Sequence, residues 1–579
     1  MKNSYLFTFF ILIFLIGCEK QTSPPNVILI ITDDQGYGDL NINGNPNIKT
    51  PTLDAFAHQS VRFNNFYVSP VCAPTRSSLM TGRYSLRTGV RDTYNGGAMM
   101  ASSEVTVAEM LKQANYATGI FGKWHLGDNY PSRPSDQGFD ESLIHLAGGM
   151  GQVGDFTNYF KKQTSYFDPV LWHNNQQEAY EGYCSDIFTE NAIEFIDKNK
   201  DQPFFCYLAF NAPHDPLQVP DEYYQIYKDV DPSEGIDTDL IPNGIMSEQT
   251  KEKTRRVYAM VTNIDDNLKK LFDKVEELGI EKNTIVIFMT DNGPQHPRYV
   301  AGMKGMKSSV HNGGIRVPFY LRYPSKFDGN QEVNEMTAHI DLLPTLSELC
   351  SAPMPKSRKI DGRSFIPSIK GEAQPQRSFF SYWTRKYPEL YNNIALQRGQ
   401  FKLVGKTDYD ASIEKFEFYD MIKDPLERNN IIAQNKAKAL NLKTEMHDIY
   451  MELVNSKNLR EVPRITLGSN FENPVYLNRN DAGGQRRVWN QEQAFSYWKV
   501  NAKEGLYDLK FKFLNPLPAN GSMYLEMGQG IQQKFNPADS LDLLEMKSVY
   551  LADGPHNFTP FYMLGRSNYF PLYVEVTAK

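Results

Sequence analysis

The stretch "NVILIITDD" (residues 26–34) joins a continuous apolar run to a pair of carboxylates. The stretch "TIVIFMTDN" (residues 284–292) repeats this arrangement, with Asp291 and Asn292 after the apolar run. Continuous runs rich in β-branched residues are typical of strands that are buried on both faces of a parallel sheet. Each stretch therefore predicts a buried strand whose carboxyl end is followed by oxygen-bearing side chains.

Two further apolar runs end in basic side chains. "YATGIFGKWH" (residues 116–125) ends with Lys123 and His125, and "PFFCYLAFNAPH" (residues 203–214) ends with His214. In sheets of parallel strands, ligands bind beyond the carboxyl ends of the strands. We therefore expect the ends of all four runs to form one shared site.

Helical patterns lie between these runs, for example in "TVAEMLKQAN" (residues 106–115) and "VYAMVTNIDDNLKKLFDKVEELG" (residues 257–279). Alternating strands and helices favour a sheet that is covered by helices on both faces. The predicted fold class is therefore α/β, with a mostly parallel sheet flanked by helices.

The size and charge of the chain narrow the possible partners. The chain has 579 residues and a formal net charge of −7. A chain of this length can bury a large core and usually divides into more than one domain. Because the acidic excess is mild, any anionic partner must be met by a local basic pocket and not by a general field. We therefore do not expect nucleic acid as a partner.

The pattern changes twice toward the carboxyl terminus. After Ser378, hairpin-like segments such as "NIALQRGQFKLV" (residues 393–404) predict a small antiparallel sheet. Further on, clean alternation as in "GLYDLKFKFL" (residues 505–514) predicts the short strands of a β-sandwich, which we expect to carry none of the chemistry. The predicted units are a catalytic α/β domain at 26–377, an antiparallel subdomain at 378–462 and an accessory β-domain at 463–579.

The amino-terminal stretch "MKNSYLFTFFILIFLIGCEK" (residues 1–20) has a lysine followed by a short apolar run, which is typical of an export signal. Within it, "LIGC" resembles a bacterial lipobox, which implies cleavage before Cys18 and lipid attachment to its thiol. An ordinary cleaved signal is the alternative. We expect residues 1–18 to be a lipoprotein-type signal peptide. The protein would be an exported bacterial lipoprotein on the periplasmic or cell-surface face of the outer membrane, touching the membrane through its lipid anchor only.

The chain has five cysteines, an odd number for an exported protein. The lipid anchor explains Cys18. Three others lie in apolar stretches and are expected to be buried, inert thiols, with one disulfide among them as the alternative; these are Cys184, Cys206 and Cys350. Cys72, in "CAPTR" (residues 72–76), is left without such an explanation.

The residues after the strand ends are suited to a hard divalent cation. Carboxylate and amide oxygens are preferred by calcium and magnesium, and we place calcium first. The candidate ligands are Asp33, Asp34, Asp291 and Asn292. One acidic pair at a strand end is usually a solvated turn, but two such pairs make a coincidence much less plausible. Positive side chains around the cation would create a pocket for a dianion or for an ester of one; these are Lys123, His125, His214 and Lys307.

Cys72 is predicted to lie at the amino end of a helix, because Pro74 suits a first helical turn. Free backbone amides at that end favour an anion. A thiolate there could act as a nucleophile, but a thiolate is a poor nucleophile toward a phosphate or sulfate dianion. The residues alone leave the role of this cysteine open.

These motifs together resemble the formylglycine-dependent type I sulfatases of the alkaline phosphatase superfamily. "CAPTR" followed by "SSLMTG" matches their Cys-x-Pro-Ser/Thr-Arg signature, and "NYATGIFGKWH" matches their second signature apart from Asn115 and Phe121. "TDDQGYGDL", "NAPH", "TDNG", "MKSSVHNGGIRVP" and "FYDMIKDPLERNNI" follow in the family's order. The resemblance covers residues 26–462 and does not extend to the predicted β-domain.

The resemblance implies that a separate maturase oxidises Cys72 to formylglycine, an aldehyde whose hydrate carries two hydroxyls. One hydroxyl attacks sulfur and releases the alcohol. The second hydroxyl then re-forms the aldehyde and expels sulfate. An unpaired cysteine in an exported enzyme is explained in this way.

The resemblance also assigns roles to the candidate residues. It places the four oxygen ligands and the modified Cys72 on calcium, with Asp291 as the base for the attacking hydroxyl. Arg76 would hold the hydrate, with Lys123 and His125 close behind it. His214 would protonate the leaving oxygen. Lys307, in preference to Lys304, would contact the sulfate.

A loop rich in aromatic and polar residues suggests a sugar substrate. "HLAGGMGQVGDFTNYFKKQTSYFDPVLWHN" (residues 145–174) mixes side chains that stack on sugars and bind their hydroxyls, although an ordinary aromatic loop would look similar. The candidate substrate contacts are Trp172, His173, His296, Arg298 and Lys304. We expect a sulfated polysaccharide or oligosaccharide, with algal glycans suggested by the family's bacterial members and host glycosaminoglycans left open.

Two rival functions remain. Phosphonate monoester and phosphodiester hydrolases of the same superfamily use the same modified cysteine. A surface-anchored, non-catalytic glycan-binding protein is the rival from another class, but such a protein would be expected to lack Cys72, Arg76 or the metal ligands, and this sequence has them all.

Overall fold

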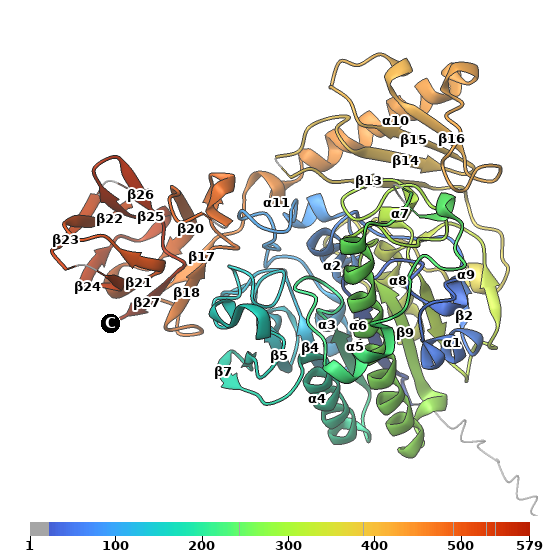
Figure 1. The fold of residues 1–579 in the computed structure, drawn as a ribbon, viewed down its shortest axis with the longest axis horizontal. Coiled ribbons are helices and arrows are strands. Elements are labelled where there is room, and N and C mark those ends of the chain that lie inside the picture. Colours follow the sequence, from blue (N-terminus) through green and yellow to red (C-terminus); the bar gives the residue numbers. More distant parts are fainter. Residues whose placement is uncertain (1–22, 242–243, 386, 490, 529, 539) are drawn as a thin grey trace, which may run out of the picture.

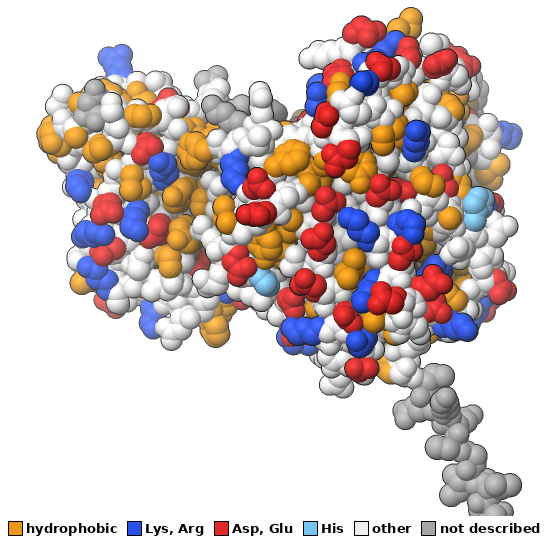
Figure 2. All heavy atoms as spheres, turned by 60° about the horizontal axis from the view of Figure 1, so that its bottom comes forward, with side chains coloured by type: hydrophobic (Ala, Val, Ile, Leu, Met, Phe, Trp, Pro, Cys, Tyr) orange, Lys and Arg blue, Asp and Glu red, His pale blue; other side chains and the backbone are white. Residues whose placement is uncertain are grey.

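The computed structural model describes residues 23–241, 244–385, 387–489, 491–528, 530–538 and 540–579 (Figure 1). The predicted signal peptide and Cys18 lie outside the described residues. Within the described part of the chain, no helix combines the length and apolar character needed to cross a membrane. Figure 2 shows basic and acidic side chains interspersed over one face of the protein, in keeping with a modest net charge.

The four apolar runs form neighbouring strands at the centre of a ten-stranded sheet. Their order is β9 (Thr284–Thr290), β1 (Asn26–Thr32), β8 (Phe204–Ala209) and β4 (Ala117–Lys123), and all four are parallel. The predicted mostly parallel α/β sheet is therefore confirmed.

Shorter strands extend this sheet on both sides, and several of them are antiparallel to their neighbours. On the β9 side the order continues with β10 (Phe319–Arg322), β2 (Val61–Phe63) and β11 (Gln331–Val333). On the β4 side it continues with β5 (Glu141–His145), β6 (Val170–His173) and β7 (Gln176–Ala179). A separate pair consists of β3 (Phe66–Tyr67) and β12 (Thr337–Ala338).

Helices cover both faces because alternate residues of the central strands are apolar on each side. Val27, Leu29 and Ile31 of β1 face one hydrophobic core, whereas Ile28 and Ile30 face another. The first core includes α2 (Cys72–Thr81), α3 (Val107–Gln113) and α8 (Leu342–Leu349). The second includes α1 (Pro51–His58), α4 (Cys184–Asn199) and the long α6 (Glu248–Glu277). Shorter helices are α5 (Asp221–Tyr227), α7 (Asn312–Ile315) and α9 (Ile366–Ile369).

The segment that follows forms an antiparallel sheet with one long helix packed on it (Figure 1). The strands are β13 (Ser378–Tyr382), β14 (Ile394–Arg398), β15 (Phe401–Gly405) and β16 (Glu417–Asp420). The helix is α10 (Lys436–Val454), and the short α11 (Lys457–Arg460) leads to the last part of the chain.

The carboxyl-terminal residues fold as two facing sheets around a separate core, to which Met99 of the α/β domain also contributes. One sheet contains β17 (Ile465–Leu467), β19 (Gly483–Gly484), β20 (Ser496–Ala502), β22 (Gly521–Met527), β23 (Gly530–Asn536), β25 (Gly554–Leu564) and β26 (Ser567–Tyr569). The other contains β18 (Val475–Asn478), β21 (Gly505–Leu517), β24 (Leu541–Leu551) and β27 (Tyr573–Ala578). On β21, Tyr507, Leu509, Phe511 and Phe513 are buried, as their alternation predicts.

This β-domain packs directly against the α/β domain. Tyr130 stacks on Phe471 with ring centroids 5.0 Å apart, and Phe156 stacks on Tyr573 at 4.3 Å. Asn478 Nδ2 donates a hydrogen bond of 2.8 Å to a carboxylate oxygen of the buried Asp128. Aromatic stacking and buried hydrogen bonds thus fix the two domains together.

Candidate active site

The ends of the four central strands meet, as the sequence predicts. The backbone N–H of Asp33 donates to the carbonyl of Ala212, and the N–H of Asp291 donates to that of Thr32. The backbone N–H of Asp34 donates to Asp291 Oδ1 at 3.3 Å. These bonds join the loops after β1, β8 and β9, so their polar side chains share one small volume.

Cys72 is the first residue of α2, and its side chain reaches the same volume. Its sulfur and one carboxylate oxygen each of Asp33 and Asp291 all lie within 4.8 Å of one another. One helical turn later, the buried Arg76 donates through Nε and Nη2 to Asp291 Oδ2 at 3.1 and 2.8 Å. Its Nη1 donates to the carbonyl of Lys123 at 3.0 Å. Arg76 therefore fixes the Asp291 carboxylate beside Cys72.

Two buried oxygens at this point have no hydrogen-bond donor among the described residues. They are Asp33 Oδ1 and Asn292 Oδ1. Buried oxygen atoms normally have a partner, because leaving one unsatisfied costs ~1–3 kcal/mol. A second cluster of possible ligands, formed by Asp33, Asp34 and His214, lies next to the first. The residues present therefore fit a hard, oxygen-preferring divalent cation.

The charges around these carboxylates lead to the same conclusion. Burial raises the pKa of Asp33, but the positive charges around it, of which Lys123 is the strongest, hold that pKa well below its usual range. Burial and the charge of Asp33 raise the pKa of Asp291 to about 7. A cation at this point would relieve the repulsion between the two carboxylates.

The Cys72 thiol is a poor nucleophile in its unmodified form. Burial raises its pKa, although the charges of Lys123 and Lys307 act in the opposite direction. The thiol is therefore protonated near neutral pH, whereas the thiolate is the reactive form. The three other described cysteines are also free and buried, as expected for inert thiols.

Lys307 and His214 flank Asp34 on the solvent side. Lys307 Nζ lies 2.7 Å from Asp34 Oδ1, and His214 Nε2 lies 3.7 Å from Asp34 Oδ2. His214 Nδ1 lies 2.7 Å from the carbonyl of Asp215, so this nitrogen carries the hydrogen. The other ring nitrogen, Nε2, is thereby left to exchange a proton with a bound substrate.

His125 is held in a strained backbone conformation, with φ of 62°. Its Nε2 lies 2.6 Å from the carbonyl of Thr93, and its buried Nδ1 has no partner among the described residues. Burial and the charge of Lys123 lower its pKa well below the ordinary value, so the ring is neutral. Gly148 packs against this ring, since a Cβ there would lie 2.5 Å from its Cε1.

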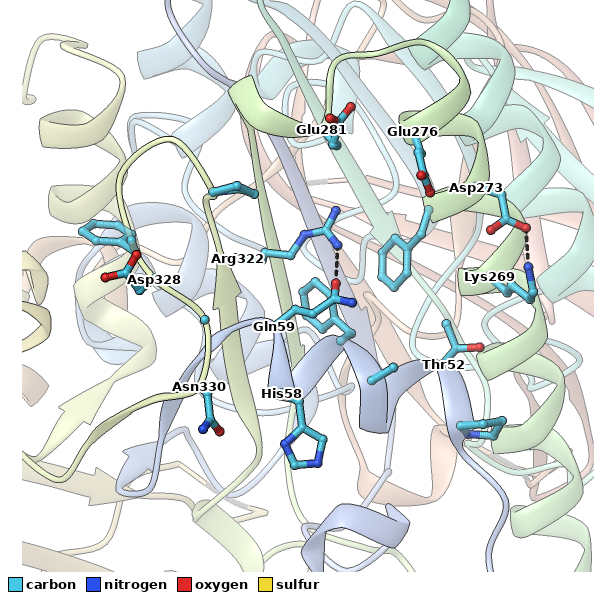
Figure 3. Close-up of a pocket in the computed structure, with 17 residues that line it drawn as sticks. Thr52, His58, Gln59, Lys269, Asp273, Glu276, Glu281, Arg322, Asp328 and Asn330 are labelled. Atoms are coloured by element: carbon cyan, nitrogen blue, oxygen red, sulfur yellow. Dashed lines mark hydrogen bonds and ion pairs between the residues drawn. The ribbon is translucent and has the colours of Figure 1, made fainter.

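These groups open into a cavity of about 360 Å³. Its lining includes Cys72, His125, His214, Lys307, Thr93, Tyr94, Gln152, Gln295, Arg385 and Trp489. A larger hollow of about 1020 Å³ lies between α1 and the end of α6 (Figure 3). There Arg322 donates to Gln59 and Lys269 pairs with Asp273, and the hollow is lined by no predicted site residue among the described ones. The smaller cavity is the candidate active site because Cys72, His214 and Lys307 line it.

Two residues expected to contact substrate have other partners. Arg298 is buried and pairs with Asp39 at 2.7 Å, so it supports the loop after β1. Lys304 Nζ donates to Glu417 at 3.0 Å and to Tyr419 at 2.9 Å, outside the cavity that Lys307 lines. Neither side chain lines the cavity that holds Cys72, so their role as substrate contacts stays a prediction.

The remaining three expected substrate contacts lie in different places. Trp172 lines a separate hollow of about 470 Å³ shared with the β-domain, and His173 pairs with Glu178 at 3.1 Å. His296 Nε2 lies 3.0 Å from a carboxylate oxygen of Asp215. His296 thus borders the site behind His214, whereas Trp172 and His173 face elsewhere.

Sequence reasoning missed the outer lining of the cavity. Tyr94, Arg385 and Trp489 come from three distant segments, and Trp489 belongs to the β-domain. Their positions follow no strand or helix period that could have revealed them. Trp489 brings the β-domain to the cavity lining, and the expectation that this domain carries none of the chemistry stays a prediction.

Comparisons with known proteins agree with this geometry. Residues 25–352 match the family model described as Sulfatase, and residues 306–455 match the one described as N-sulphoglucosamine sulphohydrolase, C-terminal. An arylsulfatase of Hemicentrotus pulcherrimus is 30% identical over 417 residues, which are 68% of this chain and 69% of the relative. An N-acetylglucosamine-6-O-sulfatase of Bacteroides thetaiotaomicron is 25% identical over 505 residues, which are 72% and 84% of the two chains.

A solved structure also covers most of the chain. It is described as Ps i-CgsB in complex with k-i-k-neocarrahexaose, and it is 28% identical in sequence. Its TM-score is 0.64, and the match covers 76% of this chain and 94% of that one.

Proposed function

We propose that this chain, which belongs to the sulfatase family and is a sulfuric ester hydrolase, removes sulfate from a sulfated polysaccharide or oligosaccharide. The observation that carries the proposal is the convergence of Asp33, Cys72 and Asp291 within 4.8 Å at the base of a cavity lined by positive side chains. A sulfate ester matches such a cavity in charge.

Residue 72 acts as formylglycine, made from the cysteine by a separate maturase. The complete "CAPTR" motif and the raised pKa of the buried Cys72 thiol support this step. One hydroxyl of the hydrate gives its proton to Asp291 and attacks sulfur, and the bond between sulfur and the sugar oxygen breaks. The second hydroxyl then re-forms the aldehyde and expels sulfate.

Calcium is the proposed ion, and magnesium is the second choice. The residues that would hold it are Asp33, Asp34, Asp291, Asn292 and residue 72. When bound, the ion supplies a positive charge that polarises the sulfate and lowers the pKa of a nearby hydroxyl. Arg76 keeps the Asp291 carboxylate turned toward residue 72 through its two hydrogen bonds.

Two side chains at the cavity mouth act on the substrate directly. Lys307 neutralises one sulfate oxygen from its place beside Asp34. In its doubly protonated imidazolium form, His214 donates the proton on Nε2 to the leaving sugar oxygen, while its Nδ1–H stays hydrogen-bonded to the carbonyl of Asp215. His125 has a neutral ring whose Nδ1 lacks a partner among the described residues, and it would act on the nucleophile.

The sugar class rests on relatives and on the cavity. The name of the Bacteroides thetaiotaomicron relative includes an N-acetylglucosamine 6-O-sulfate ester, and the solved relative was crystallised with k-i-k-neocarrahexaose. An algal sulfated glycan is our first choice of substrate, and a glycosaminoglycan is the second. The protein would meet such polymers outside the cytoplasm, exported by residues 1–18 and anchored through a lipid on Cys18 at the outer membrane.

The test is desulfation of a panel of defined sulfated oligosaccharides, followed by mass and linkage analysis of the products. We expect sulfate release from at least one saccharide, loss of activity with a chelator, and better recovery with calcium than with magnesium. Matched phosphate and phosphonate esters should be cleaved more slowly. Faster cleavage of those esters than of every sulfate would overturn the proposal in favour of a phosphonate or phosphodiester hydrolase.

A further inference from the structure

The outer wall of the active-site cavity is built by three segments that lie outside the central sheet. Tyr94 follows α2 in the chain, Arg385 follows β13, and Trp489 ends the short helix η10 (Arg486–Trp489) of the β-domain. We propose that these three side chains form a subsite for a saccharide that carries a second oxyanion besides the sulfate to be removed. This inference rests on the proposed function.

The aromatic part of this wall is an angled pair of rings. The centroids of Tyr94 and Trp489 lie 4.9 Å apart, and the ring planes make an angle of 47°. Trp489 is half-buried, and it packs against an apolar cluster to which both domains contribute. That cluster consists of Leu146, Val153, Phe156 and Leu572. The ring is thus supported from one side while it lines the cavity.

The turn that carries Trp489 is anchored by a buried arginine. Arg479 Nη1 donates to the carbonyls of Val488 and Gln491, at 3.0 and 2.9 Å, on either side of Trp489. Its Nε donates to the carbonyl of Pro571 at 2.9 Å, and Arg479 itself is fully buried. Burying an arginine is costly unless its donors are used. The turn is therefore a built part of the β-domain.

The charged part of the wall is held just as firmly. Arg385 Nη1 donates to Asp92 Oδ1 at 2.9 Å and to Thr93 Oγ1 at 2.8 Å. Its guanidinium carbon lies over the ring of Tyr94 and over that of Trp383, 4.9 and 4.7 Å from their centroids. The side chain is still 28% exposed and lines the cavity. A fixed guanidinium edge is therefore presented to a ligand.

This combination specifies the chemistry of the ligand. Aromatic faces offer apolar area to the C–H face of a sugar ring, and Gln152 and Gln295 add amide groups on the cavity lining. A planar guanidinium recognises an oxyanion through two parallel hydrogen bonds. The ligand is therefore a sugar with a second sulfate or a carboxylate, placed on the same ring or on the next one.

The wall also touches the catalytic centre through one short segment. Asp92 holds Arg385, the Thr93 carbonyl lies 2.6 Å from His125 Nε2, and Tyr94 pairs with Trp489. A saccharide bound to the wall is thus positioned relative to His125 by consecutive residues. The β-domain completes the substrate site through Trp489.

The test compares the wild type with Trp489→Ala, Arg385→Ala and Arg385→Lys. The substrates are nitrophenyl sulfate, a monosulfated oligosaccharide, its disulfated form and its sulfated uronate form. The matched control is Phe535→Ala, which removes an aromatic ring that is 57% exposed on β23 of the same domain.

We expect Trp489→Ala to lower kcat/KM on the oligosaccharides by roughly 10- to 100-fold, through both kcat and KM. The loss on nitrophenyl sulfate should be smaller, because that substrate has no sugar to stack. Arg385→Ala should lower the preference for the doubly anionic substrates by roughly 10-fold or more. Arg385→Lys should keep part of this preference, because lysine retains the positive charge but cannot make the two parallel hydrogen bonds of a guanidinium. The disulfated and uronate arms show which oxyanion is recognised.

Equal fractional losses on nitrophenyl sulfate and on the oligosaccharides would overturn the subsite, and so would unchanged kinetics in both Trp489→Ala and Arg385→Ala. Binding of the same saccharides to Cys72→Ala protein, with and without the wall substitutions, gives a readout that needs no turnover. If the wild type desulfates no saccharide of the panel, the proposed function fails. If Cys72→Ala protein binds saccharides no better than its Trp489→Ala derivative does, the subsite fails.

Discussion

The base of the active-site cavity and its outer wall differ in how the sequence encodes them. The base is made by the ends of four adjacent parallel strands and the first turn of α2. The wall is made by Tyr94, Arg385 and Trp489, which meet only because three separate units of the chain pack together. The catalytic residues of the base can therefore be recognised in short stretches of sequence, whereas the residues of the wall come together only through tertiary packing.

The most severe loss of activity is expected when Cys72, at the base of the cavity, is replaced. Replacing Cys72 by alanine should abolish turnover of every sulfate ester, because no nucleophile remains. In active wild-type protein, mass spectrometry of the tryptic peptide should show residue 72 without sulfur, as formylglycine. Fully active protein with an unmodified cysteine would contradict this. Cys72→Ser should also be inactive or stop as the sulfated protein, because serine has one hydroxyl and not two.

The next effect separates the two histidines of the base by leaving group. His214→Ala should lose roughly 10²- to 10⁴-fold in rate on a saccharide sulfate, because a sugar alcohol must be protonated as it leaves. The loss on nitrophenyl sulfate should be markedly smaller. His125→Ala is the matched comparison, and it should slow both substrates to a similar degree. Equal losses on both substrates for His214→Ala would reject its role as the acid.

Two lysines three residues apart allow a direct comparison between a residue of the cavity base and a residue outside the cavity. Lys307 lines the cavity beside Asp34, whereas Lys304 is bound to Glu417 and Tyr419. Lys307→Ala should lower kcat/KM by roughly 10²- to 10³-fold, the usual cost of removing one preorganised contact to a developing anion. Lys304→Ala should stay within about 3-fold of wild type, since an exposed ion pair contributes little. The reverse order would show that the cavity is misassigned.

The smallest effect concerns the junction that holds the wall in place. Asp128 of the α/β domain and Asp481 of the β-domain are buried beside each other. Burial raises the pKa of Asp481 to about 6, and burial together with the Asp481 charge raises the pKa of Asp128 well above its ordinary value. A folded-state pKa above the unfolded value means that stability is greatest at low pH and falls as the pH rises toward that folded pKa.

Asp481→Asn should remove this repulsion. At pH 7 we expect the variant to be more stable than wild type by roughly 1–3 kcal/mol. The difference should shrink toward pH 4, where Asp481 is protonated in the folded wild type. Thermal unfolding at several pH values measures it, and Asp553→Asn, at an exposed position between β24 and β25 of the same domain, is the control. An advantage that grows as the pH falls would contradict the assignment.

The strands and the base could be predicted because each functional residue directly follows a buried apolar run. Asp33 and Asp291 are one residue beyond β1 and β9, and Lys123 ends β4. The carboxyl ends of adjacent parallel strands must meet, so their distance in sequence does not matter. Cys72 could be placed at the start of α2 for a different reason, because Pro74 is compatible with the first turn of a helix.

The wall and the substrate contacts could not be predicted from the sequence. The role of each of these side chains depends on the residues that it contacts in the folded protein, and those residues are distant in sequence. Arg298 looked like a substrate contact, but it is fully buried against Asp39, which is far away in sequence. Trp172 looked like a sugar platform, but its ring packs edge-on against Tyr476 of the β-domain. Trp489 gave no local signal at all, because its place depends on how the β-domain docks.

The three consecutive residues Asp92, Thr93 and Tyr94 have a kinetic consequence. A sugar bound at the wall contacts side chains held by this same three-residue segment, and the carbonyl of Thr93 in that segment orients His125. Binding energy gained far from sulfur can then be spent on alignment at the reacting centre, where it raises the turnover number and not merely the affinity. Longer saccharides should therefore be turned over faster at saturation than the fragments they contain, and a plot of kcat against chain length would report how far the pocket extends.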